Sequence, residues 1–230
     1  MTYPPPTEMA GQLLIGGFDG TTLPSDMQAR LASGQLGGAI LFRRNIGSLD
    51  DVVALNRSIH DCIDGLPPFV AVDQEGGRVV RLVDGVTPIP PMGRLAQRAE
   101  PMDVMAIGRM IGSELAALGF NVNFAPVLDL DTNPDNPIIG DRSFGPDPEL
   151  VSKMGAALTL GLIAGGVIPC GKHFPGHGDT STDSHLTLPV VATSQKLLFK
   201  RELVPFTHLA RGGIPMLMTA HIIVKALDDP

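Results

Sequence analysis

Short apolar runs alternate with longer amphipathic stretches along the whole chain. Six runs are typical of buried strands: residues 13–18, 38–42, 69–73, 122–127, 167–170 and 215–220. The stretches between them carry apolar side chains at spacings of three and four and predict helices at residues 25–31, 48–62, 103–118, 148–164 and 194–210. Strands that alternate with helices in this way pair in parallel, because each helix returns the chain to the same end of the sheet.

Two parallel α/β architectures fit this alternation, a closed (β/α)8 barrel and an open doubly wound sheet. The open sheet predicts a glycine-rich phosphate loop after the first strand, and residues 16–20 match neither the dinucleotide fingerprint nor the P-loop. Polar residues instead follow almost every strand, which favours a TIM-type barrel with its site at the strands' carboxyl ends. Such a barrel needs eight strands and about 250 residues. We therefore expect residues 1–230 to be one barrel domain, truncated after about six βα units of a longer protein.

Composition narrows the classes of function. A net charge of −7 argues against non-specific binding to nucleic acid or to an anionic membrane. No apolar run approaches the ~18 residues of a membrane span, and residues 1–6 do not read as a signal peptide. Two cysteines, Cys62 and Cys170, are too few for a disulfide framework and favour a cytoplasmic location. We expect no cofactor.

The segment KHFPGHGDTSTDSH, residues 172–185, concentrates groups that can transfer protons. It places three histidines, two aspartates and one lysine within 14 residues, directly after a predicted buried strand. Pro175, Gly176 and Gly178 exclude a continuous helix, so the segment is a loop. A polar, glycine-rich loop in this position is where an α/β enzyme carries its catalytic groups.

Four motifs together resemble the bacterial β-N-acetylglucosaminidases of glycoside hydrolase family 3. They are VDQEGGRV at residues 72–79, FAPVLD at 124–129, GDRSF at 140–144, and the KHFPGHG and DSH of the 172–185 segment. They follow the order found in that family and span most of the chain. The resemblance implies a barrel and a retaining glycosidase that releases terminal, non-reducing N-acetyl-β-D-glucosamine. It also implies saccharides from peptidoglycan recycling in the cytoplasm as substrates.

The resemblance assigns the acid/base part to His185, paired with Asp183. Glycoside hydrolysis requires an acid that protonates the departing oxygen and a carboxylate that stabilises or traps the oxocarbenium-like carbon. A histidine titrates near ~6.5, and a neighbouring carboxylate favours the protonated ring and fixes its tautomer. A tight turn is needed to bring these two side chains together. We expect their nearest atoms to lie within about 4 Å.

The resemblance also implies a set of sugar-binding residues: Asp73, Arg81, Arg142, Lys172 and His173. For two of them a purely structural role competes with sugar binding. Asp73 is a possible helix N-cap, and Arg142 is a possible partner of Asp141 or Asp147 in a surface ion pair. The same match gives Glu75 a structural part, and we expect His177 to shape the loop.

The catalytic nucleophile of the family is an aspartate downstream of the segment that resembles residues 219–221. Nothing in this sequence matches its motif, and Asp228 and Asp229 lie in the wrong context. We therefore expect residues 1–230 alone to be inactive and the full-length protein to be active.

Two other classes of function compete with the glycosidase. A metal-dependent barrel hydrolase would use His173, His177, Asp183 and His185 as zinc ligands, but the His-x-His pair usual after the first strand of such barrels is absent. A non-catalytic sugar-binding remnant would explain the missing nucleophile. An intact pair of Asp183 and His185 argues against it.

Overall fold

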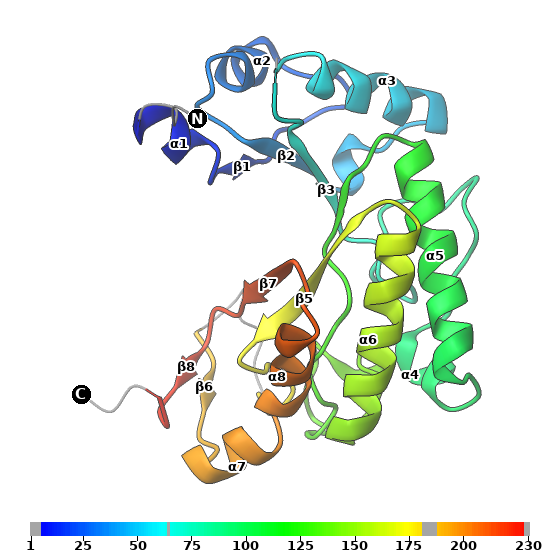
Figure 1. Cartoon of the computed structure of the whole chain (residues 1–230), viewed down its shortest axis with the longest axis vertical. Helices are drawn as coiled ribbons and strands as arrows, with labels where there is room; N and C mark the ends of the chain where they lie inside the picture. The colour runs from blue at the N-terminus through cyan, green and yellow to red at the C-terminus, as the bar shows by residue number, and fades with distance from the viewer. Residues whose placement is uncertain (1–5, 64, 181–187, 228–230) are drawn as a thin grey trace.

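A curled sheet of six parallel strands organises the protein. The structure is a computed structural model that describes residues 6–63, 65–180 and 188–227. The strands lie in the order β1 (Ile15–Gly16), β2 (Gly38–Leu41), β3 (Phe69–Val72), β4 (Val122–Asn123), β5 (Ile168–Phe174) and β7 (Met216–Thr219). Figure 1 shows the sheet as an open half-barrel with helices on its outer side and with β1 and β7 at its two edges. The predicted architecture, six βα units of a TIM-type barrel, is confirmed.

The helices are α1 (Pro6–Gly11), α2 (Ser25–Ala32), α3 (Leu49–His60), α4 (Met92–Ala96), α5 (Pro101–Ala117), α6 (Pro148–Ala164), α7 (Gln195–Lys200) and α8 (Leu203–Arg211), with 3-10 turns η1 (Arg43–Asn45) and η2 (Gly140–Arg142). Four of the helices, α2, α3, α5 and α6, lie between strands where the apolar spacing predicts them, whereas α1, which precedes β1, and α4 are not predicted. None of the helices in the described ranges is long and apolar enough to cross a membrane.

The single helix predicted for residues 194–210 is wrong. The structure has two helices there, α7 and α8, which meet at Arg201 and Glu202. Pro205 explains the break, because it has no N–H to donate to the carbonyl of Arg201 and its ring would clash with that carbonyl. A two-stranded parallel sheet, β6 (Val190–Val191) and β8 (Ile223–Val224), packs beside this junction and is not predicted by the sequence pattern.

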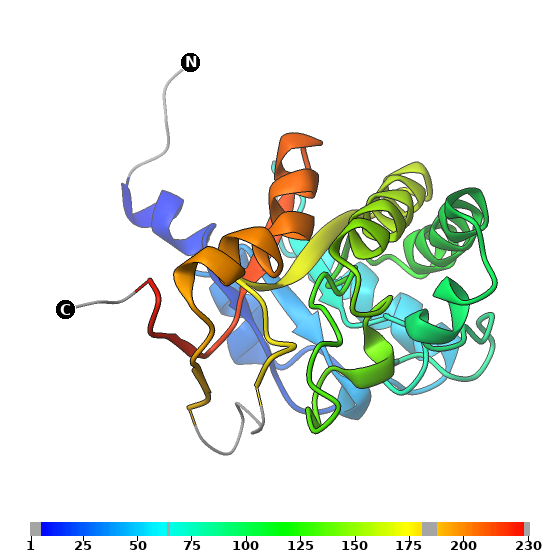
Figure 2. The ribbon, with the colours of Figure 1, turned by 90° about the horizontal axis from the view of Figure 1, so that it is seen from below.

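Helices α5 and α6 approach each other closely through glycines, and they run side by side in both views (Figures 1 and 2). Gly108 and Gly112 lie on one face of α5, and they face Gly161 of α6 and Gly165, which caps the C-terminus of α6. A Cβ atom on Gly161 would lie 2.2 Å from the carbonyl oxygen of Met105. The backbones therefore meet where any larger side chain would separate them.

Substituting Gly161 with alanine is expected to destabilise the protein. Overpacking costs about 1–3 kcal/mol, whereas alanine gains at most about 1 kcal/mol of helix propensity over glycine. The neighbouring atom is a backbone oxygen that cannot rotate away, so we expect the packing cost to dominate. Urea denaturation of G161A, compared with the neighbouring surface variant L160A, measures the difference. Equal stabilities would contradict the close helix contact.

Candidate active site

A cleft of about 640 Å³ lies at the carboxyl ends of the central strands. Its walls come from the segments that follow β2, β3, β4, β5 and β7, as expected for a TIM-type barrel. The structure brings together in this cleft all the residues that the resemblance predicts to bind sugar: Asp73, Arg81, Arg142, Lys172 and His173. The loop histidine His177 and the exposed His221, which follows β7, also line it.

Lys172 lies at the centre of a row of alternating charges. Its side chain is buried, with Nζ 2.7 Å from Asp73 Oδ1 and 2.5 Å from Glu75 Oε1. Arg142 donates through Nε and Nη2 to the two oxygens of Glu75, both at 2.9 Å. Arg81 Nη2 donates to Asp73 Oδ2 at 3.1 Å. The order Arg81, Asp73, Lys172, Glu75, Arg142 holds each charged group beside an opposite one.

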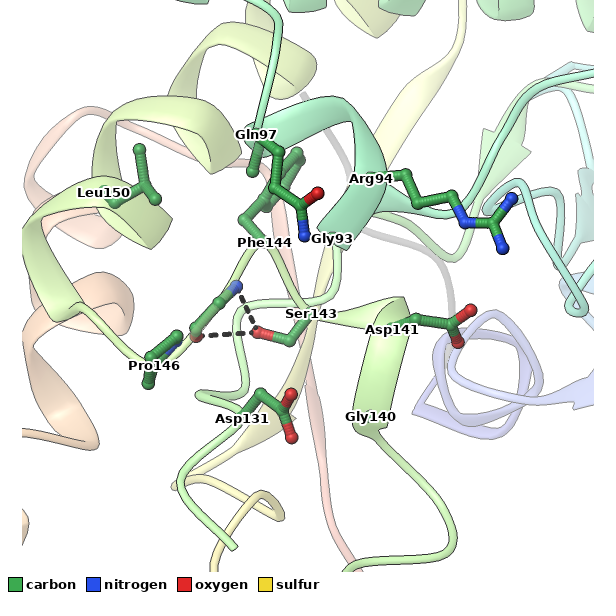
Figure 3. A pocket seen from close by; sticks show the side chains of 12 residues that line it. Gly93, Arg94, Gln97, Asp131, Gly140, Asp141, Ser143, Phe144, Pro146 and Leu150 are labelled. Atoms are coloured by element: carbon green, nitrogen blue, oxygen red, sulfur yellow. Dashed lines mark hydrogen bonds between the residues drawn. The ribbon is translucent and has the colours of Figure 1, made fainter. Parts of the chain in front are cut away.

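The purely structural roles considered for Asp73, a helix N-cap, and for Arg142, a surface ion pair with Asp141 or Asp147, are wrong. The first helix after Asp73 is α4, which begins at Met92, so Asp73 caps no helix. Arg142 is held by Glu75, whereas Asp141 lies 3.8 Å from Arg78. A second hollow lies beside η2 and the start of α6 (Figure 3), and its lining includes none of the predicted sugar-binding residues.

Glu75 is ionised because of its neighbours. Burial alone would raise the pKa of its carboxyl group, but the charges of Lys172 and Arg142 outweigh burial and lower that pKa to about 2. A permanent negative charge here fixes the directions of both cations. The hydrogen-bonding groups that Lys172 and Arg142 turn toward the cleft are therefore set before a ligand arrives.

Asp129 organises the start of the loop after β5. Its side chain is fully buried, and Oδ2 accepts from the backbone N–H of His173 at 3.1 Å and from His173 Nδ1 at 2.6 Å. Oδ1 accepts from the backbone N–H of His177 at 2.7 Å. Burial opposes ionisation of Asp129, but the His173 ring and these N–H groups lower its pKa. Because a carboxylate only accepts, Nδ1 of His173 carries a proton and Nε2 is left for a ligand.

Asp129 is a site residue to which the sequence analysis assigned no part, and Glu75 is one to which it assigned only a structural part. Both follow strands within motifs that carry the family resemblance, Glu75 after β3 and Asp129 after β4. That position in the sequence was the available signal. The sequence position does not show which side chains pair with each carboxylate, because those partners lie 44 to 97 residues away along the chain.

His177 is buried, and its side chain turns back into its own loop. Its ring Nδ1 lies 2.9 Å from Thr180 Oγ1, and burial lowers the pKa of the ring. Asn136 Nδ2 donates to the carbonyl oxygens of His177 and Gly178 at 2.9 and 3.1 Å. These contacts agree with the prediction that His177 shapes the loop.

The predicted acid/base residues, Asp183 and His185, lie outside the described residues. Their separation stays a prediction. The zinc alternative needs both of them as well. Within the described ranges, no group of three or more His, Cys, Asp or Glu side chains is placed to hold a metal ion.

The glycosyl hydrolase family 3 N-terminal domain model matches residues 8–230. The chain belongs to glycosyl hydrolase family 3. This confirms the family predicted from the four motifs. The family 3 β-N-acetylglucosaminidase of Paenibacillus sp. str. FPU-7 has a structure similar to this chain, with a TM-score of 0.93 and 39% identity. That similarity covers 98% of this chain and 44% of the Paenibacillus protein.

Further family 3 relatives are similar over most of this chain. NagZ from Neisseria gonorrhoeae in complex with N-trifluoroacetyl-D-glucosamine is 37% identical, with a TM-score of 0.88 over 94% of this chain and 65% of NagZ. The beta-hexosaminidase of Alkalilimnicola ehrlichii is 41% identical over 96% of this chain, and beta-hexosaminidase A of Pseudoalteromonas piscicida is 38% identical over 91%. The chain spans 64% and 36% of the lengths of these two proteins, respectively.

Proposed function

We propose that this chain supplies the sugar-binding residues and the acid/base pair of a retaining β-N-acetylhexosaminidase. The observation that supports this most strongly is the convergence of Asp73, Arg81, Lys172, Arg142 and His173 on one cleft. Fixed charged donors and acceptors suit the hydroxyl groups of a sugar, because a polar site rejects analogues that leave its groups unpaired. The N. gonorrhoeae complex holds an N-acylated glucosamine, which favours an N-acetylglucosamine unit as the ligand here.

In the proposed reaction, His185 donates a proton to the departing glycosidic oxygen and later removes one from the attacking water. Asp183 holds the ring in the required tautomer and stabilises its protonated form. The row of charges from Arg81 to Arg142 binds and orients the non-reducing sugar. A retaining mechanism also needs a carboxylate nucleophile, and no motif for it is found in this sequence. Peptidoglycan-derived fragments in the cytoplasm are the proposed substrates.

Hydrolysis of an aryl N-acetyl-β-D-glucosaminide tests this function. We expect turnover by the full-length protein, a decrease in kcat of about 10²–10⁴-fold in H185A, and little turnover of the matching aryl β-D-glucoside. Residues 1–230 alone should bind N-acetylglucosamine without hydrolysing the aryl substrate.

Three results would count against the proposal. Saccharide binding without hydrolysis by the full-length protein would favour the sugar-binding alternative. Activity that depends on zinc and is lost with a chelator would favour the metal-dependent hydrolase. Turnover by residues 1–230 alone would show that the nucleophile lies within this chain.

A further inference from the structure

Arg78 lies in a tight turn that follows β3 and lines the cleft. The backbone N–H of Glu75 donates to the carbonyl oxygen of Val79 at 2.9 Å, and the N–H of Val79 donates back to that of Gly76 at 3.2 Å. Gly76 and Gly77 have positive φ angles, 104° and 56°, which glycine adopts without strain. The two glycines of the VDQEGGRV motif thus fix the point at which the Arg78 side chain leaves the backbone.

The Arg78 guanidinium donates to three consecutive backbone carbonyls in the segment that follows β4. Nη1 lies 3.3 Å from the oxygen of Pro137, and Nη2 lies 2.6 Å from that of Ile138 and 3.2 Å from that of Ile139. The contact of Arg78 with a carboxylate is longer, since Nε lies 3.8 Å from Asp141 Oδ1. The main partner of Arg78 is therefore this stretch of backbone in the wall of the cleft.

The carbonyl oxygen of Ile138 also accepts from Arg142, whose Nη1 lies 3.0 Å away. Nε and Nη2 of Arg142 donate to Glu75. Three of its five N–H groups are thereby occupied, and two are left for a ligand in the cleft. Glu75 and Arg78 belong to the same turn, so one loop fixes Arg142 by two routes. Glu75 holds the guanidinium directly, and Arg78 holds the carbonyl to which it donates.

Asn136 holds the opposite edge of the same peptide units. Its buried side chain accepts through Oδ1 from the N–H groups of Ile138 and Ile139, both at 2.8 Å. The N–H of Ile139 and the carbonyl of Ile138 belong to one planar peptide unit. That unit is therefore held at its N–H edge by Asn136 and at its carbonyl edge by Arg78. Removing Arg78 would release the carbonyl edge, to which Arg142 is bonded.

We propose that Arg78 is a positioning residue that sets the direction of the Arg142 guanidinium toward the sugar. This inference rests on the proposed function and adds a residue to it. Arg78 acts through the carbonyl of Ile138, because the hydrogen bonds of its own guanidinium go to backbone oxygens. Its side chain is half exposed, so its removal should affect sugar binding more than stability.

Inhibition of the full-length protein by N-acetylglucosamine, with the aryl N-acetyl-β-D-glucosaminide as substrate, tests this role. R78A should raise the inhibition constant about 10-fold, because a misdirected Arg142 loses one charge-assisted hydrogen bond to the sugar. N-Acetylglucosamine is uncharged, so loss of the Arg78 charge alone should have little effect. The matched control is R30A, which removes an exposed arginine in the last turn of α2 and should behave as wild type.

A double-mutant cycle shows whether Arg78 acts through Arg142. R142A should itself raise the inhibition constant, and adding R78A to it should change that constant by less than about twofold. Losses that add fully would mean that Arg78 contacts the sugar independently, and the inference would be wrong. If R142A is too slow to assay, R142K, which keeps a positive charge at this position, serves as the background.

The remaining outcomes separate this inference from the proposed function. If wild type neither hydrolyses the aryl substrate nor binds N-acetylglucosamine, the proposed function is wrong. If R142A weakens inhibition while R78A matches wild type, only the role of Arg78 is wrong. A lower urea midpoint in R78A with an unchanged inhibition constant would make Arg78 a structural residue and overturn the inference. Unchanged inhibition in R142A would remove Arg142 from the sugar-binding residues and would overturn it as well.

Discussion

Replacing Glu75 with glutamine is expected to lower kcat/KM for the aryl N-acetyl-β-D-glucosaminide by about 10²-fold or more. The carboxylate of Glu75 accepts from Lys172 and from two nitrogen atoms of Arg142. A neutral amide has one acceptor oxygen, so its NH2 group must face a cation. Removing one partner of a buried ion pair costs about 3–5 kcal/mol. Both cations would shift away from the positions in which they bind sugar.

The matched control for E75Q is E149Q, which makes the same chemical change at an exposed position in the first turn of α6. Kinetics of the full-length protein and N-acetylglucosamine binding by calorimetry measure the two effects. We expect E149Q to match wild type in both. Unchanged sugar affinity in E75Q would show that the two cations keep their positions without this carboxylate.

The acid stability of E75Q offers a second measurement. Glu75 has a pKa of about 2 in the folded protein and an ordinary value of 4.5. Between these pH values the unfolded chain binds more protons, so stability falls as pH decreases through this window. The pKa difference corresponds to stabilisation on the order of 3 kcal/mol at neutral pH. The wild-type free energy of unfolding should therefore decline between pH 4.5 and 2, and E75Q should show a flatter curve.

The second large effect is expected for Asp129 replaced by asparagine. The two carboxylate oxygens accept three hydrogen bonds, from the N–H and ring of His173 and from the N–H of His177. An amide in either orientation points NH2 at a donor. No water reaches this fully buried group to compensate. We expect a loss of about 2–4 kcal/mol in the free energy of unfolding, and weaker sugar binding because the His173 ring loses its partner.

Urea denaturation and N-acetylglucosamine titration of D129N measure these losses. D131N is the control, since Asp131 lies two residues further on and lines the separate hollow in Figure 3. Equal free energies of unfolding for D129N and D131N would contradict the anchoring part given to Asp129.

Much of the fold was predictable because buried parallel strands leave a strong apolar signal. Residues 38–42 and 69–73, for example, correspond closely to β2 and β3. The break between α7 and α8 was also readable, since Pro205 is incompatible with one continuous helix. The β6–β8 pair was not, because two-residue strands have no periodicity to detect.

The sequence predicts which residues line the site, but it does not predict which of them form ion pairs with one another. Polar residues after β3 and β5 indicate the same end of the sheet, but the choice of Glu75 over Asp141 as the partner of Arg142 depends on how the sheet curls. The curvature of the sheet cannot be predicted from the residues next to these positions in the sequence. The placement of His185 beside Asp183 stays a prediction from the motif.

The neighbouring strands β2, β3, β4 and β5 are also consecutive along the chain. During synthesis, each new βα unit can therefore dock on the unit made just before it. The last contributor to the row of charges is Lys172, and the Asp129 anchor needs only His173 and His177 in addition. A nascent chain can thus assemble its sugar-recognition centre once residues near Gly178 have left the ribosome, before α7, α8 and β7 have emerged.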